Sequence, residues 1–191
     1  VAATTLSQGG QAITFYEAAS TGGARCVSGA SVAMTDAGAT DLGASTVSGT
    51  LGITSAGAVT DSGTLAITGA TTISASGQDI TLDEAASTFG TLALTGANVA
   101  ITDAGATDLG ASTVSGTLGI TSAGAVTDSG TLAITGVTTI SASGQDITLD
   151  EAASTVAAPA VTGANVVVSD AGATDLGAST VSGTLGITSA G

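Results

Sequence analysis

The chain has 191 residues, 43% of them hydrophobic, but only 2% are aromatic and none is tryptophan, which excludes a core built from large side chains. One Lys or Arg stands against 15 Asp and Glu, there is no histidine, and the formal net charge is −14. Binding to nucleic acid or to an anionic membrane surface needs a basic patch, so neither is expected as a partner, and histidine chemistry is excluded as well.

An acidic chain of small residues is often disordered, but disordered chains also lack apolar and β-branched residues. Here Leu, Ile and Val recur at regular intervals among Thr and Ser, which favours strands. No apolar run approaches the roughly 18 residues of a membrane span, so no membrane insertion is expected. The single cysteine, Cys26, cannot form an internal disulfide.

An internal repeat covers the whole chain. The segment DAGATDLGASTVSGTLGITSAG begins unchanged at Asp36, Asp103 and Asp170, which sets a 67-residue period. We interpret the chain as one array, with a partial repeat at 1–35, repeats at 36–102 and 103–169, and a partial repeat at 170–191. Neither end resembles the polar cap that solenoids place on terminal repeats. The sequence therefore predicts a piece of a longer repetitive chain, or a subunit that stacks end to end.

Short apolar and polar alternations recur along the unit, separated by Gly, Ser-Ala-Gly or Asp-Ala-Gly turn signals. In chain order they include 51–54, 58–61, 65–68, 72–74, 79–82, 92–95, 99–102 and 108–110. Strands this short, joined by corners of two or three residues, do not suit a β-sandwich. Together with the long period they predict an all-β fold, a parallel β-solenoid or β-helix.

The number of residues in one coil follows less directly from the repeat. Nine strand candidates in each repeat predict three triangular coils of about 22 residues. The alternative is five two-strand coils of about 13 residues. In either frame Leu, Ile and Val stack inside, and threonines face outward, namely Thr50, Thr54, Thr64, Thr68, Thr117 and Thr121.

The triangular frame places ten of the 15 carboxylates on one corner of the rod. They are Glu17, Asp36, Asp61, Asp83, Glu84, Asp103, Asp128, Asp150, Glu151 and Asp170. Carboxylates stacked about 4.8 Å apart repel one another unless they are solvated, raised in pKa or bridged by cations. Because Ca²⁺ takes six to eight oxygen ligands, this acidic corner is a candidate calcium site. The alternative is a solvated corner with no metal, and no other cofactor is expected.

One repeat position carries three different residues, Arg25, Leu92 and Pro159. Proline cannot donate to a strand ladder, and a buried arginine is costly. These substitutions predict an outer loop or bulge at 89–94 in each unit. Cys26, next to an inward-facing Val27, is expected to face outward.

Two runs, GTLAITGATTISASGQDITL and GTLALTGANVAITDAG, carry a family resemblance. They resemble the repeats of filamentous-haemagglutinin-type and autotransporter-passenger β-helices, which belong to very large secreted bacterial surface proteins. The resemblance covers the whole chain in composition and periodicity. It implies a parallel β-solenoid, export to the cell surface, and a role as adhesin stalk or extracellular fibre; it transfers no catalytic or binding residue.

The sequence thus predicts a structural protein of an extracellular, cell-surface fibre or stalk, with its own copies as partner. The alternative is an adhesin segment that binds cell-surface or matrix glycans, and a more distant one is an ice-binding solenoid, suggested by the threonines. An enzyme is not expected. Pairs such as Asp36 with Asp41, or Asp83 with Glu84, recur in every copy, whereas an active site needs a non-repeating cleft.

Overall fold

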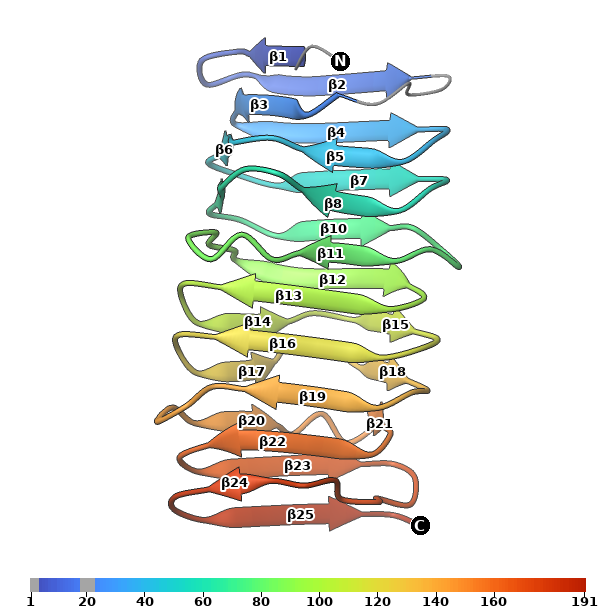
Figure 1. The fold of residues 1–191 in the computed structure, drawn as a ribbon, viewed down its shortest axis with the longest axis vertical. Coiled ribbons are helices and arrows are strands. Elements are labelled where there is room, and N and C mark those ends of the chain that lie inside the picture. The colour runs from blue at the N-terminus through green and yellow to red at the C-terminus, as the bar shows by residue number, and fades with distance from the viewer. Residues whose placement is uncertain (1–3, 18–22) are drawn as a thin grey trace.

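The chain forms a rod of stacked coils. The computed structural model describes residues 4–17 and 23–191, which contain 25 β-strands and no helix. The strands wind about one axis, and the two chain ends lie at opposite ends of the rod (Figure 1). Every pairing between named strands is parallel, as in β4 with β7 and β13 with β16. The all-β parallel solenoid predicted from the sequence is confirmed.

The strands form two sheets that run the length of the rod. Sheet A holds twelve strands: β1 Thr4–Ser7, β3 Arg25–Gly29, β5 Thr40–Leu42, β6 Ser45–Val47, β8 Val59–Asp61, β9 Leu65–Ile67, β11 Ile80–Leu82, β13 Val99–Asp103, β16 Leu118–Ser122, β19 Thr138–Ser141, β22 Pro159–Gly163 and β24 Thr180–Val181. Sheet B holds thirteen: β2 Ala12–Glu17, β4 Ser31–Asp36, β7 Leu51–Ser55, β10 Thr71–Ser74, β12 Thr91–Gly96, β14 Thr107–Leu109, β15 Ser112–Val114, β17 Val126–Asp128, β18 Leu132–Ile134, β20 Ile147–Leu149, β21 Thr155–Val156, β23 Val166–Asp170 and β25 Leu185–Ser189.

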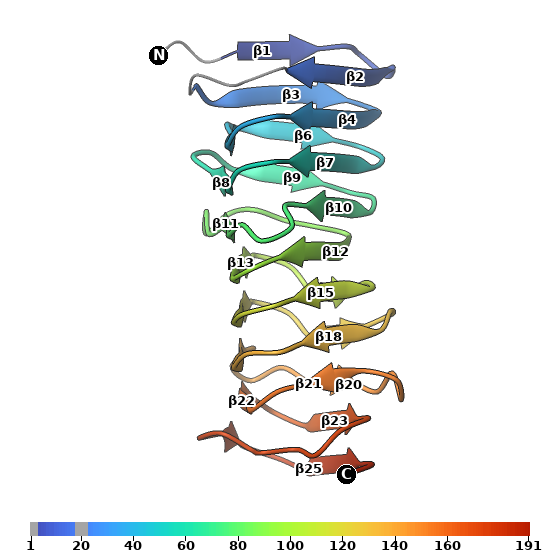
Figure 2. The same ribbon diagram turned by 90° about the vertical axis from the view of Figure 1, so that its right-hand side faces the viewer.

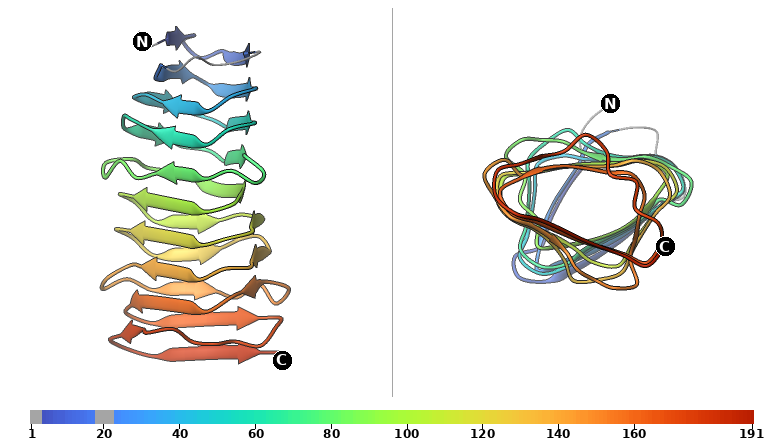
Figure 3. Two further views of the ribbon diagram at one scale, coloured as in Figure 1. Left: turned by 45° about the vertical axis from the view of Figure 1, so that its right-hand side comes forward. Right: turned by 90° about the horizontal axis from the view of Figure 1, so that it is seen from below.

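A regular coil consists of one longer strand and two short ones. Strand β7 crosses sheet B, and the chain then turns into β8 and β9, which lie end to end in sheet A. Two views along the side of the rod show this alternation (Figure 2; Figure 3, left). Seen end-on, the coils superpose into one closed outline (Figure 3, right). The three-sided coil is therefore as predicted, with two of its sides merged into one sheet.

The repeat contains three and a half coils, which differs from the predicted three. Sheet B passes from β4 to β23 in seven steps, through β7, β10, β12, β14, β17 and β20. Strand β23 holds the same repeat position as β4, two repeats later. Two repeats thus make seven coils, and the mean coil length is about 19 residues, where about 22 or about 13 had been predicted. Paired residues are separated by as few as 17 positions (Leu92 and Leu109) and as many as 22 (Ala133 and Thr155).

The half coil arises at β12, the longer strand of residues 91–96. One end of β12 pairs with β14 (Thr91 with Asp108), and the other end pairs with β15 (Thr95 with Thr113). One long strand thus replaces two short ones, and the next strand, β13, is long again. As a result, the long strands lie in sheet B from β4 to β12, in sheet A from β13 to β22, and in sheet B again at β23 and β25.

The sequence predicts half a coil too few in each repeat because one of the short strands is too short to recognise. Around Thr88 the chain makes only an isolated parallel bridge to Ala66. This segment, which adds to the nine predicted strands, therefore gives little indication of a strand in the sequence. In the next repeat the same position forms the two-residue strand β21. Because the inward side of such a segment is one or two residues long, sequence alternation cannot distinguish it from a turn.

Aliphatic side chains fill the interior as predicted. Leu, Ile and Val from successive coils form one continuous buried cluster, for instance Leu51, Ile73, Leu94 and Val126, each at most 2% exposed. The six threonines expected to face outward are all exposed. Cys26 is half-buried between the buried Arg25 and Val27 on the opposite face of β3, which agrees with its predicted outward direction.

The predicted outer loop at 89–94 is wrong. Leu92 is fully buried in β12, and Pro159 is a buried residue of β22 that pairs with Thr138. Proline is tolerated there because it is the first residue of its strand, and its carbonyl still accepts a hydrogen bond from Gly177 N at 2.8 Å. Arg25 is also buried in a strand, where an acidic partner offsets its charge.

The corners where coils touch require glycine. A Cβ on Gly69 would lie 2.5 Å from the carbonyl oxygen of Gly49 in the coil above, closer than real Cβ contacts come. The backbone at this corner also forms a direct hydrogen bond from Gly69 N to Gly49 O at 3.0 Å. Glycine therefore sets how closely consecutive coils approach here.

Candidate functional site

The main polar feature inside the rod is a carboxylate turn that recurs in each repeat. Asp36, Asp103 and Asp170 end the long strands β4, β13 and β23, and all three are buried. In each, Oδ1 accepts a hydrogen bond from the backbone N–H two residues on, as from Gly38 to Asp36 at 2.8 Å. Oδ2 accepts the hydroxyl of the threonine four residues on, at 3.0–3.3 Å. The sequence Asp-Ala-Gly-Ala-Thr thus satisfies its own buried carboxylate.

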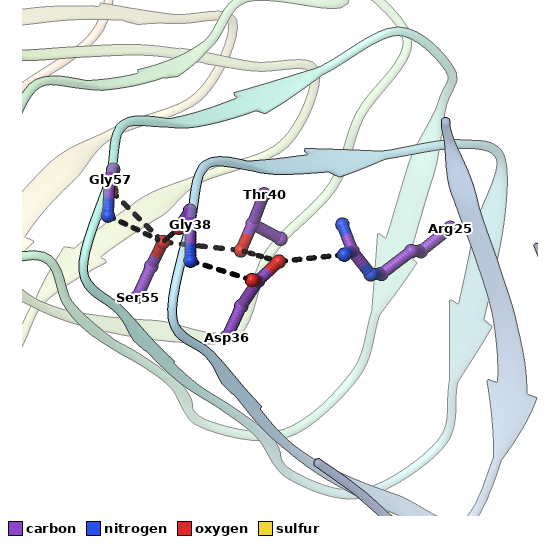
Figure 4. Close-up of polar contacts among 6 residues, drawn as sticks. All are labelled: Arg25, Asp36, Gly38, Thr40, Ser55 and Gly57. Carbon is purple, nitrogen blue, oxygen red and sulfur yellow. Dashed lines mark hydrogen bonds and ion pairs between the residues drawn. The ribbon is translucent and has the colours of Figure 1, made fainter. Parts of the chain in front are cut away.

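A serine from the next coil extends this network. The Thr40 hydroxyl lies 3.2 Å from Ser55 Oγ, which donates to the carbonyl oxygen of Gly38 at 2.8 Å. Figure 4 shows these groups converging at one corner. The same contacts recur one repeat later between Thr107 and Ser122, at 3.0 Å. The turn therefore ties the strand that it ends, β4 or β13, to the coil that follows.

Only the first of these turns contains a cation. Arg25 is the single Lys or Arg of the chain, and its Nη2 lies 2.7 Å from Asp36 Oδ2 with both side chains buried (Figure 4). The equivalent residues of the later repeats are Leu92 and Pro159. Asp103 consequently has the same hydrogen bonds as Asp36 without an ion pair.

Burial raises the pKa of Asp103 above its ordinary value of 3.8. Hydrogen bonds from the Gly105 backbone, the Thr107 hydroxyl and the Phe89 backbone act in the opposite direction but do not offset the loss of solvent. Burial therefore disfavours the charged form of the Asp103 side chain.

Two further aspartates show the same effect at a different corner. Burial is the main cause that raises the pKa of Asp61 and of Asp128, and the nearby charges of the acidic pair that follows in the next coil add to it. Asp61 Oδ1 accepts the backbone N–H of Asp83 at 2.9 Å, and Asp128 Oδ1 accepts that of Asp150 at the same distance.

These raised pKa values predict that the free energy of unfolding is higher at acidic pH than at neutral pH. Between the ordinary Asp value of 3.8 and the raised values of Asp61, Asp103 and Asp128, the folded chain binds more protons than the unfolded chain. The free energy of unfolding therefore falls as pH rises through this window. Urea denaturation is expected to give a higher free energy of unfolding near the lower end of the window than at neutral pH. The double variant Asp103→Asn, Asp128→Asn should flatten this dependence, and an unchanged slope would contradict the assignment.

The ten acidic residues do not form one line, which corrects the sequence-based picture. Asp61, Asp83, Glu84 and Asp103 lie at or just after the ends of three neighbouring strands of sheet A, β8, β11 and β13. Their counterparts lie in the same way on sheet B, at β17, β20 and β23: Asp128, Asp150, Glu151 and Asp170. The half coil in each repeat turns equivalent residues to opposite sides of the rod.

The remaining two predicted ligands lie near the N-terminal end of sheet B. Glu17 is paired with Asp36 along the backbone, but its side chain lies outside the described part of the structure. Among the side chains that the structure describes, no three Asp, Glu or Cys groups come together in a way that could hold a metal ion. Calcium binding at these carboxylates stays a prediction.

A ladder of hydrogen bonds through Asn98 is a further polar feature, and the sequence did not predict it. Asn98 Nδ2 donates to Asp79 Oδ1 at 2.9 Å, and Asn98 Oδ1 accepts the backbone N–H of Thr117 at 3.0 Å. The same bonds join Asp146, Asn165 and Thr184. The 19-residue spacing of these three residues is the signal that reveals the coil length, but it is visible only once the register is known.

The described residues thus form a repeat β-solenoid whose polar groups bind one coil to the next. Three consecutive segments, residues 29–95, 96–162 and 163–191, match a family described as repeats of unknown function, DUF5649. The matches cover most of the chain, which therefore belongs to this family, and the first two each span one repeat. No curated protein and no solved structure matches the chain significantly. No helix in the described part is long and apolar enough to cross a bilayer.

Proposed function

We propose that the chain is a structural segment of an extracellular fibre or stalk, of the filamentous-haemagglutinin or autotransporter-passenger type. The observation that carries this proposal is the uninterrupted stacking of the coils: inward aliphatic side chains form one cluster from Ile13 to Val168. Backbone hydrogen bonds run along the axis through both sheets. A rod held by axial bonds and a continuous core resists bending and stretching along its whole length.

The polar groups support a mechanical role as well. The buried turn of Asp103 is engaged by Gly105 and Thr107, and the ladder around Asn98 links three successive coils. Catalytic carboxylates need access to a substrate, whereas these are occupied by bonds between or within coils. We therefore assign their hydrogen bonds to holding the rod together.

Surface labelling tests this function. Immunogold labelling of intact cells that make the full-length natural protein, with antibodies against this chain, is expected to decorate extended surface fibres. Label that appears only after the cells are permeabilised would overturn the extracellular placement. Surface label without filaments would overturn the fibre.

An adhesin segment is the second candidate, and one surface feature favours it. An open groove of about 520 Å³ includes Tyr16, Thr35 and Asp36 in its lining, and Tyr16 is 74% exposed. An exposed aromatic ring beside threonine and serine hydroxyl groups suits a sugar ring. Binding of the chain to a glycan array that is lost in Tyr16→Ala would support the adhesin, and a chain that binds no glycan would leave the structural rod.

A further inference from the structure

The sides of the rod carry two kinds of outward surface. The first, here called the groove face, is formed by the long strands β4, β7, β10 and β12 of sheet B. Its outward residues form two columns along the axis, Thr35, Thr54, Ser74 and Thr95 beside Ala33, Gly52, Thr72 and Ala93. Because alanine and glycine hold most of the second column, a shallow groove of about 220 Å³ runs over Ala33, Gly52 and Thr72. None of the outward residues of these four strands is charged.

The second surface, here called the ridge face, is formed by the three-residue strands β5, β8 and β11 of sheet A. A strand this short has one outward residue, so the face presents a single column of Asp41, Thr60 and Thr81. Further carboxylates follow at the corner beyond these strands, where the exposed Asp83 donates its backbone N–H to Asp61 Oδ1 at 2.9 Å. The ridge face is therefore an acidic side of these coils.

The half coil exchanges the two faces between the sheets. In the next repeat the groove face lies on sheet A, with the low column Ala100, Gly119, Thr139 and Ala160. The ridge face lies on sheet B, on β14, β17 and β20, with the column Asp108, Thr127 and Thr148. At each level of these two repeats, a groove face on one sheet is therefore matched by a ridge face on the other.

Charge decides which faces of two copies can meet. Arg25 is the single Lys or Arg of the chain and is buried, so the exposed side-chain charges are all negative. Two ridge faces in contact would bring carboxylates such as Asp108 of one copy against those of the other, and these repel. Two groove faces in contact would force the same meeting one repeat further along, because each sheet alternates between the two faces. Only a groove face on a ridge face avoids paired carboxylates at every level.

We propose that copies of the chain pack side by side and parallel, with equivalent coils at the same level and the ridge face of one copy in the groove face of the next. The single column of Asp41 and Thr60 fits the low column over Ala33 and Gly52, and the hydroxyls beside the groove can donate hydrogen bonds to it. This contact rests on the proposed fibre function, because it bundles rods that point in one direction. The two faces that meet are different, so the contact continues from copy to copy and does not close into a dimer.

A single contact of this kind is weak. The groove face of one repeat consists of four strands of four to six residues, and strands about 4.8 Å apart then cover roughly 300 Å². A standard stable interface buries about 800 Å² on each partner. We therefore expect weak pairing of this chain, which strengthens with each repeat that is added to the array.

Cross-linking of two single-cysteine chains tests which faces meet. In the background Cys26→Ala, Thr72→Cys on the groove face is mixed with Thr60→Cys on the ridge face. The reagent is a bismaleimide of about 10 Å reach, the spacing of face-packed sheets. The mixture should give heterodimers, and each variant alone should give no dimer. A mixture without heterodimers would overturn the proposal.

A third cysteine variant is the matched control. Thr139 holds the same repeat position as Thr72 and is also exposed, but it lies on the groove face of the other sheet. Thr139→Cys mixed with Thr72→Cys should therefore not cross-link. Dimers from that mixture, or from Thr72→Cys alone, would show groove faces in contact and contradict the proposed packing.

Sedimentation velocity of charge variants tests the same contact. Thr54→Lys places a cation beside the groove, opposite the acidic ridge of the next copy, whereas Thr68→Lys places it at an exposed corner outside both faces. The two variants have the same net charge. Thr54→Lys should associate at a concentration about two- to fivefold lower than Thr68→Lys, the gain expected of an exposed ion pair, and Thr54→Glu should weaken association. Equal association of the two lysine variants, or weaker association of Thr54→Lys, would overturn the proposal.

This contact and the fibre function fail in different ways. Surface fibres decorated by immunogold, together with no cross-linking of the purified chain, would reject the lateral contact and leave the fibre function standing. Heterodimers from the purified chains, together with label confined to permeabilised cells, would support the contact and reject the extracellular fibre.

Discussion

Replacing Asp36 by asparagine is expected to lower the free energy of unfolding by about 3–5 kcal/mol. The substitution keeps an acceptor for the Gly38 N–H but removes the negative charge that lies 2.7 Å from Arg25 Nη2. Since Arg25 is only 2% exposed, its charge would remain buried beside a neutral amide. The measurement is urea denaturation followed by far-UV circular dichroism at neutral pH.

Asp103→Asn is the matched control for this prediction. Asp103 occupies the same turn with the same bonds to Gly105 and Thr107, but Leu92 stands where the first repeat has Arg25. An amide there removes a charge that burial disfavours, so stability should stay the same or rise. Equal losses in Asp36→Asn and Asp103→Asn would mean that hydrogen bonding, and not the ion pair, determines the effect.

Truncating one isoleucine of the stacked aliphatic interior should cause the second large loss in the free energy of unfolding. Ile120→Ala removes three carbon atoms from a side chain that is 2% exposed between the coils of β13 and β19. Because the neighbouring coils are held in register by their backbones, the cavity cannot close fully, and the cost is expected to be about 2–5 kcal/mol. Thermal and urea unfolding of the purified chain measure this cost.

The same chain contains a control for the Ile120→Ala prediction. Ile187 stands in the same Leu-Gly-Ile-Thr-Ser sequence as Ile120 but is 37% exposed in β25. Ile187→Ala should cost less than half as much as Ile120→Ala when both are measured on this purified 191-residue chain, since less apolar area leaves water on folding. Similar costs at the two positions would show that local strand propensity, and not stacking, sets the stability.

The half coil determines how the repeats present their surfaces. Strand β4 lies in sheet B, its equivalent β13 lies in sheet A, and β23 lies in sheet B again. Any surface group therefore reappears on the opposite side of the rod after one repeat and on the same side after two. Removal of one repeat would shorten the rod by three and a half coils and turn everything beyond it by half a turn.

Much of the fold was predictable because the copies of the repeat are nearly identical in sequence. The inward Leu51 and Ile53 alternate with the outward Thr50 and Thr54, and this period of two defines strands and their core face without any knowledge of the partners. The composition alone indicated a narrow core, since stacked aliphatic side chains leave no room for large aromatic rings. The burial of Arg25 was not predictable, because its partner Asp36 comes from the other sheet.

By itself, the sequence determined the class of fold: strand lengths, turn positions, inward faces and the repeating unit are all local properties of the chain. Only the tertiary structure decided how many coils that unit makes and which groups share a side. Coil length depends on which residues pair between distant strands, and the pairing of β12 with both β14 and β15 is a property of the stack. The acidic residues, which the sequence predicts to form a single line, therefore lie on two sides of the rod.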